Sequence, residues 1–369
     1  MRTFSHPGYK RFLLSVGCLL SIHFTALFFL TLFRLVFFFS ANYDFPDQEH
    51  VGFMSIWPAF IRGVWFDNVI ACYILLIPLV AVSISALFNY YGKILWNVTC
   101  IFFSLFYGIV LLVTAANIPY FQYFFKIINS SVFNWFGYMN TTAGMVFGET
   151  SYYPPLIGFL LTLVLFIWLM RRLIRHFQRL LNTKNPSVFW LDRIYIFLTA
   201  GICIGLCLFG IRGRTGYNPI KVSAAYYCTD PFLNQLGISP VFNLLSSTLD
   251  DSRKENRYLH LMPENEALEN TRHYLNRPGI EGISPIARQI NASDSLRRPN
   301  IVLIFMESMS AHLMKRFGQQ KELTPFLDSL YRQSLAFSNF YSSGIHTNHG
   351  MYATLYSFPS ILKRNAMKG

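Results

Sequence analysis

The sequence predicts an α-helical membrane domain of five spans, followed by the N-terminal part of an α/β domain. Hydrophobic residues make up 53% of the 369 residues and charged residues only 13%, whereas a soluble domain has about 45–50% and about 25%. Long stretches before Phe209 lack ionisable residues, and the chain from Arg212 onward is dense in them. We therefore expect a membrane half followed by a water-soluble half.

Five apolar segments approach the length of about 20 residues that a helix needs to cross the hydrocarbon layer. They are residues 12–33, 69–88, 97–118, 155–170 and 194–209. The last two reach that length only with their flanks. The first follows Lys10 and Arg11 and is too long for a cleaved signal sequence, so we expect a signal anchor that stays in the protein.

The basic residues of the short loops predict the orientation of the spans. They gather before the first span and in the loops after the second and the fourth: Arg2, Lys10, Arg11, Lys93, Arg171, Arg172, Arg175, Arg179, Lys184 and Arg193. The alternate loops hold only Arg62 and Lys126, beside several acidic residues. We therefore expect a cytoplasmic N-terminus, and the odd number of spans places everything after Arg212 outside the cytoplasm.

The distribution of charge also argues against two classes of function. The basic stretch Arg171–Leu181 is explained by its place in a cytoplasmic loop beside anionic headgroups, so we expect no nucleic-acid partner. The spans lack the paired acidic residues that usually mark an ion path, which argues against a transporter. Arg34, near the outer end of the first span, is expected to extend its charged end to the membrane surface.

The predicted domains are residues 1–211 for the membrane domain, 212–298 for a helical connector at the outer face, and 299–369 for the start of an extracytoplasmic domain. In the connector, a Ser-Pro pair opens a predicted helix over Ser239–Asp251, and a proline followed by acidic residues opens another over Met262–Leu275.

Two chemistry-bearing residues of the last domain follow predicted strands. The unbroken apolar run Ile301–Met306 is typical of a buried strand, and Glu307 follows it at once. After a predicted helix over Leu323–Leu335, the alternating stretch Ala336–Ser343 predicts a second strand, with Thr347 shortly beyond it. Because ligands of open α/β sheets bind beyond the carboxyl ends of the strands, we expect Glu307 and Thr347 at one edge of one sheet.

These residue types suit phosphoryl chemistry. A threonine becomes a nucleophile only beside a base or a metal ion, and a divalent cation also neutralises charge on a phosphoryl group. Backbone N–H groups at a helix start after Thr347 can hold a phosphate, and His346 and His349 are candidates for substrate binding. Each residue has an ordinary alternative: Glu307 as a solvated acid, Thr347 as a helix N-cap, and the histidines as surface residues.

The stretches NIVLIFMES, LTPFLDSL and FSNFYSSGIHT, together with the five spans, resemble the lipoteichoic acid synthase-like membrane phosphoglycerol transferases of the alkaline phosphatase/sulfatase superfamily. The resemblance implies that Glu307 is a metal ligand and that Thr347 is both the nucleophile and a metal ligand. It implies manganese as the metal, with magnesium or zinc as alternatives. The partners that it implies are a phosphatidylglycerol-like donor and an envelope glycan or polymer acceptor, among the lipids of a bacterial inner membrane.

Two other functions stay open at this point. One is a phosphoethanolamine transferase, although the single cysteine outside the spans, Cys228, does not fit the disulfide-rich loops of those enzymes. The other is a non-catalytic envelope protein that has lost its catalytic half.

The sequence departs from the resembled family in two respects. Asn348, His349 and Gly350 follow the threonine, where Gram-positive synthases have a small residue and acids, so the acceptor stays open. The family's domain is several times longer than the stretch from Arg297 to Gly369, and its Asp-His metal pair lies far downstream. We therefore expect the chain to be a C-terminally truncated fragment or an inactive product.

Overall fold

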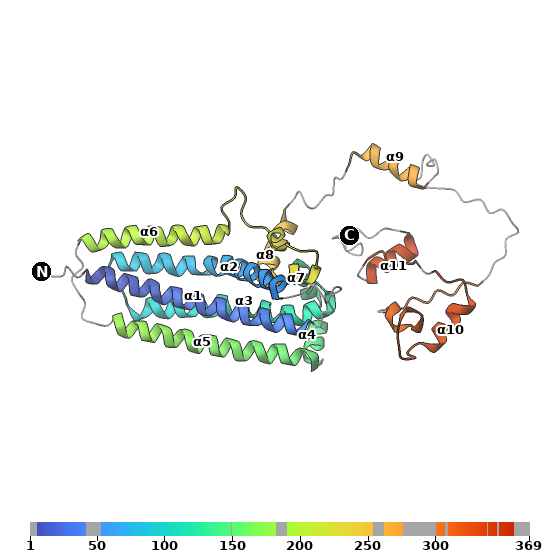
Figure 1. Cartoon of the computed structure of the whole chain (residues 1–369), viewed down its shortest axis with the longest axis horizontal. Coiled ribbons are helices and arrows are strands. Elements are labelled where there is room, and N and C mark those ends of the chain that lie inside the picture. The colour runs from blue at the N-terminus through green and yellow to red at the C-terminus, as the bar shows by residue number, and fades with distance from the viewer. Residues whose placement is uncertain are drawn as a thin grey trace. The chain divides into compact units, whose positions relative to one another are not determined.

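The structure is a computed structural model that describes residues 6–41, 53–148, 150–181, 190–253, 262–275, 300–306, 309–337, 339–344 and 347–357. The chain divides into two units, Met1–Met262 and Pro263–Gly369. The first unit is a bundle of long helices, and the second contains short helices joined by irregular chain (Figure 1).

Five long helices build the first unit: α1 (Pro7–Ser40), α2 (Phe53–Leu87), α3 (Lys93–Phe124), α5 (Tyr153–Leu181) and α6 (Trp190–Arg212). Each is long and apolar enough to cross a membrane, so the prediction of five spans is confirmed. The helices are longer than the apolar segments that predicted them, because the flanking turns continue the same backbone hydrogen bonds.

Helix α1 lies at the centre of the bundle (Figure 1). It packs against α2, α3, α5 and α6, while α2 also packs against α6 and α3 against α5. Aromatic rings fill the core: Phe166 of α5 lies edge-on to Phe29 of α1 and to Tyr107 of α3, with ring centroids 6.1 and 5.3 Å apart. Such pairs stabilise a core beyond the burial of their area.

Short helices cover one end of the bundle, which we call the connector end: η1 (Ser130–Tyr138), α4 (Met139–Gly148), η2 (Thr150–Tyr152), η3 (Val222–Ala225), α7 (Pro231–Leu236) and α8 (Pro240–Ser252). Helix α7 packs against α1 and α2, and α8 packs against α2, α3 and η1. The first part of the expected connector therefore belongs to the same unit as the bundle. The predicted helix Ser239–Asp251 corresponds to α8.

Helix α7 was not predicted, because its six residues are too few to show a periodic pattern. A local signal was nevertheless present: Asp230 precedes Pro231, and its Oδ1 accepts a hydrogen bond from Leu233 N at 2.8 Å as the N-cap. Phe232 is buried, with its ring near those of Phe37 and Phe121. The aromatic contact fixes α7 to the bundle.

Arg34 does not extend to the membrane surface, so that expectation is wrong. Its Nη1 donates to Asp67 Oδ2 at 2.7 Å and its Nε donates to the Leu236 carbonyl at 3.0 Å, and the two charged side chains are only 4% and 3% exposed. A Cβ at Gly63 would overlap the Arg34 guanidinium group, so a side chain there would displace the arginine. The ion pair joins α1, α2 and α7.

The second unit contains α9 (Glu264–Leu275), η5 (Ala311–Leu313), η6 (Lys315–Phe317), α10 (Pro325–Gln333) and α11 (Thr347–Tyr356). The predicted helices Met262–Leu275 and Leu323–Leu335 correspond to α9 and α10. In the part of this unit that the structure describes, no segment is a strand. The apolar run Ile301–Met306, expected as a buried strand, is 45–86% exposed. A strand forms only when neighbouring strands complete its hydrogen bonds, and no described segment pairs with this run.

Candidate active site

Thr347 is the first residue of α11, and its side chain is exposed. A compact turn precedes it, in which Ser342 Oγ donates to the Gly344 carbonyl at 2.5 Å. The first N–H groups of any helix lack partners within the helix, and the N-terminus carries a partial positive charge. Thr347 therefore stands where an anionic phosphoryl group is favoured by the backbone.

His349 lies in the same first turn and is half buried. Ser343 Oγ donates to its backbone carbonyl at 3.4 Å, so the turn before α11 folds back onto the start of the helix. Thr347 and His349 are thus brought together on one turn. Glu307 and His346, the other two predicted site residues, lie outside the described residues.

Phe305 contacts the start of α11, a feature that the sequence analysis did not identify. A Cβ built at Gly350 would lie 3.4 Å from Phe305 Cζ, so the ring packs against the backbone three residues after Thr347. Phe305 precedes Glu307 by two residues. The contact brings the chain just before Glu307 next to the turn that bears Thr347. Gly350, the glycine that ends the polar stretch TNHG (Thr347–Gly350), was the signal available in the sequence.

The described residues do not form a metal site by themselves. Among them, no group of three or more histidine, cysteine, aspartate or glutamate side chains gathers closely enough to hold an ion. Thr347 and His349 are fewer than the three or four protein ligands that are typical of catalytic metal sites.

Asp328 of α10 organises the segment between the two predicted strands. Its carboxylate accepts hydrogen bonds from Lys315 N at 3.2 Å, from Arg316 N at 3.4 Å and from the Thr324 hydroxyl at 3.3 Å. Desolvation acts to raise the pKa of Asp328, but these hydrogen bonds together outweigh it and hold the pKa below its usual range. Asp328 therefore fixes η6 to the start of α10 and has a structural role.

Comparison with known proteins gives a match in the C-terminal segment. Residues 299–368 match the family model described as Sulfatase. No curated protein and no solved structure matches the chain. The matched segment contains Glu307, Thr347 and His349, and supports the sulfatase/alkaline phosphatase superfamily, whose members typically use a divalent metal.

Proposed function

We propose that this protein is a membrane-bound, metal-dependent transferase that moves phosphoglycerol, or a similar phospho-headgroup, from a phosphatidylglycerol-like phospholipid to a glycan or polymer of the cell envelope. The observation that carries the proposal is the combination of five membrane helices with a sulfatase-superfamily segment in one chain. The helices would anchor the chain in a membrane, and the headgroups of membrane phospholipids are joined through phosphodiesters. Thr347 at the start of α11 is the proposed nucleophile.

The proposed reaction has two displacements at phosphorus. Thr347 Oγ forms a bond to the phosphorus of the lipid, and the bond from phosphorus to the diacylglycerol oxygen breaks. The proton that the threonine loses balances the proton that diacylglycerol gains. A hydroxyl of the acceptor then attacks the phosphothreonine and restores the Thr347 hydroxyl. The N–H groups of the first turn of α11 favour the negative charge that develops on the phosphoryl oxygens, and His346 and His349 are proposed to contact the substrate.

The proposed metal ligands are Glu307 and Thr347, and manganese is the proposed ion, with magnesium or zinc as alternatives. Such an ion, when bound, lowers the pKa of the oxygen that it contacts and neutralises phosphoryl charge. The ion would need ligands beyond Thr347 and His349, since the described residues supply too few. Loss of activity with a chelator and its recovery with manganese would support this part of the proposal.

We place the protein in a bacterial cell membrane with a cytoplasmic N-terminus and an extracytoplasmic C-terminal segment. The support is the distribution of basic residues among the loops. In the bundle, the first turns of α1, with Lys10 and Arg11, and the last turn of α5, with Arg179, lie at the end opposite α7 and α8 (Figure 1). A reporter that is active only outside the cytoplasm, fused after Arg253, is expected to be active.

The test of the nucleophile is release of the labelled headgroup from phosphatidylglycerol, measured in membranes that contain the full-length protein. We expect Thr347→Ala to reduce release to background, because a methyl group cannot attack phosphorus. Thr354→Ala is the matched control, since Thr354 is also an exposed threonine of α11. Full activity of the Thr347→Ala variant would refute the assignment. Labelled phosphatidylethanolamine in the same assay tests the alternative headgroup.

A further inference from the structure

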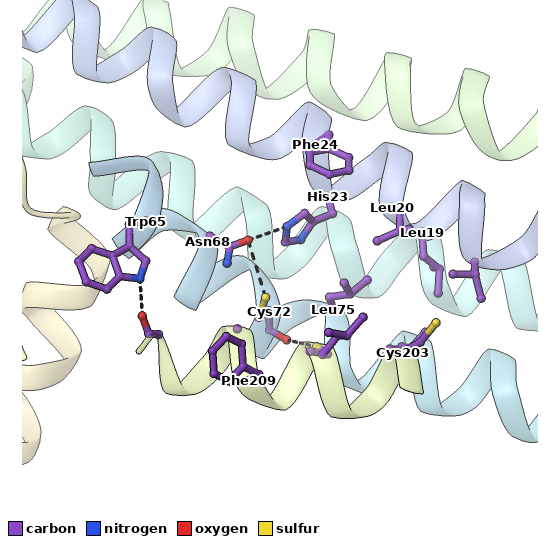
Figure 2. Close-up of a pocket in the computed structure, with 16 residues that line it drawn as sticks. Leu19, Leu20, His23, Phe24, Trp65, Asn68, Cys72, Leu75, Cys203 and Phe209 are labelled. Carbon is purple, nitrogen blue, oxygen red and sulfur yellow. Dashed lines mark hydrogen bonds between the residues drawn. The ribbon is translucent and has the colours of Figure 1, made fainter. Parts of the chain in front are cut away.

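A cleft of about 390 Å³ lies between α1, α2 and α6 of the first unit (Figure 2). Helices α1 and α6 meet near their first residues, where His6 Nδ1 lies 2.9 Å from Asp192 Oδ1 and the Tyr9 hydroxyl lies 3.1 Å from the Thr199 hydroxyl. Farther along, both helices still pack against α2, but the cleft separates them. Its volume falls in the range of about 300–1,000 Å³ that is usual for ligand sites.

The surface of the cleft is mainly apolar. Its walls carry leucine and phenylalanine side chains of all three helices: Leu19, Leu20, Phe24, Leu75, Leu206 and Phe209. Some of the polar groups are paired: His23 Nε2 lies 3.0 Å from Asn68 Oδ1, and Cys207 Sγ donates to the Cys72 carbonyl at 3.3 Å (Figure 2). The other ring nitrogen of His23, Nδ1, is buried without a hydrogen-bond partner among the described residues. A ligand in this cleft would therefore meet a mainly hydrocarbon surface.

The cleft is long and open to the surroundings of the bundle. On α2 its lining runs from Trp65 to Leu79, which corresponds to about 21 Å of helix. That length exceeds one leaflet of a hydrocarbon layer about 30 Å thick. Phe24 and Leu206 line the cleft although they are 64% and 65% exposed, so they stand at its rim. Because these helices have the length and composition of membrane spans, we expect lipids at that rim.

Two arginines flank, in the sequence, the last residue that lines the cleft. Gly213 is the last lining residue of the chain, between Arg212 and Arg214, and its carbonyl accepts a hydrogen bond from Trp65 Nε1. Arg212 Nη2 donates to the Tyr217 carbonyl at 2.7 Å, and Arg214 Nε donates to the Asn218 carbonyl at 2.6 Å. These bonds hold both guanidinium groups against the loop of residues 216–218 that follows the last lining residue, Gly213, and N–H groups of a guanidinium suit a phosphate.

We propose that the cleft holds one acyl chain of an anionic phospholipid, with its phosphate beside Arg212 and Arg214. The apolar walls match the chain, and the arginines match the charge of the headgroup. The inference deepens the proposed function and rests on it in one respect: the lipid in the cleft would be the headgroup donor.

The test uses the full chain in lipid nanodiscs that contain a trace of phosphatidylglycerol with a photoactivatable diazirine in one acyl chain. After irradiation, mass spectrometry of the peptides locates the adducts. We expect adducts concentrated on residues 16–24 of α1 and 203–210 of α6. Leu206→Trp fills the rim and is expected to reduce them by about fivefold or more, since an added ring occupies the space of the chain. Leu161→Trp on α5 is the matched control, because Leu161 is 67% exposed and outside the cleft.

The headgroup part of the inference is tested by Arg212→Gln with Arg214→Gln. This double variant is expected to reduce adducts from the phosphatidylglycerol probe and to leave those from a phosphatidylcholine probe unchanged. Adducts spread evenly over the exposed faces of α5 and α6, or unaffected by Leu206→Trp, would overturn the inference. Labelling requires no turnover, so Thr347→Ala should label normally. Adducts in the cleft without headgroup transfer would refute only the proposed function. Headgroup transfer without adducts in the cleft would refute only the proposed lipid site.

Discussion

The two units differ in how their apolar residues are stabilised. In the bundle, residues such as Phe12, Phe66 and Phe166 are fully buried among neighbouring helices, whereas Ile301–Met306 of the second unit are exposed in the described structure. A membrane helix completes its backbone hydrogen bonds within its own segment, but a strand depends on other strands. An apolar segment that forms a helix is therefore stabilised within its own stretch of chain. An apolar segment that would form a strand needs partners from elsewhere in the chain.

The largest expected effect concerns the buried ion pair of the bundle. Arg34→Met leaves Asp67 buried without its partner, and the expected loss of stability is about 3–5 kcal/mol. The measurement is thermal unfolding of the full chain in detergent, followed by the fluorescence of its tryptophans. Arg175→Met on the exposed face of α5 is the control and should change little. If both variants unfold at the same temperature as the parent, the ion pair does not stabilise the bundle.

A smaller effect is expected at the contact between Phe305 and Gly350 in the second unit. Gly350→Leu should displace the ring and destabilise the start of α11 by less than the roughly 1–3 kcal/mol that overpacking costs in a well-packed core, because the Phe305 ring is partly exposed and can move. Gly350→Ala is the control, since a single Cβ would stand 3.4 Å from Phe305 Cζ and is nearly accommodated. Hydrogen exchange of the α11 amides measures the change. Equal protection in the two variants would mean that Phe305 does not support this helix.

The smallest expected effect is the pH dependence of α10. The pKa of Asp328 is lowered in the folded protein, so its contribution to stability is present above the ordinary carboxyl value of about 3.9. It is lost as the pH falls through the lower folded value. We expect hydrogen exchange in residues 325–333 to accelerate below that value, and Asp328→Asn to exchange with little dependence on pH in this window. An unchanged pH profile in the variant would contradict the assigned role of Asp328.

Much of the bundle was predictable, because the length of each apolar segment indicates a span without reference to the rest of the chain. The buried environment of Arg34 was not predictable. Its position near the end of a span suggested the membrane surface, and only the packing of α1 against α2 brings Asp67 next to it. Helix α7 was missed because it is short, although Asp230 and Pro231 marked its start. For the candidate site, the position of Thr347 at the start of a helix was predicted. The contact between Phe305, which precedes Glu307, and Gly350, which follows Thr347, was not predicted.

By itself the sequence determined which segments form helices long and apolar enough to cross a membrane and where Thr347 begins its helix, because both depend on residues close together in the chain. Only the tertiary structure decided the pairing of Arg34 with Asp67 and with Leu236, which lie 33 and 202 positions away. It also decided the cleft, whose walls come from three helices of the bundle. The physical reason is that backbone hydrogen bonds and apolar length act locally, whereas ion pairs and cavities depend on which helices pack side by side.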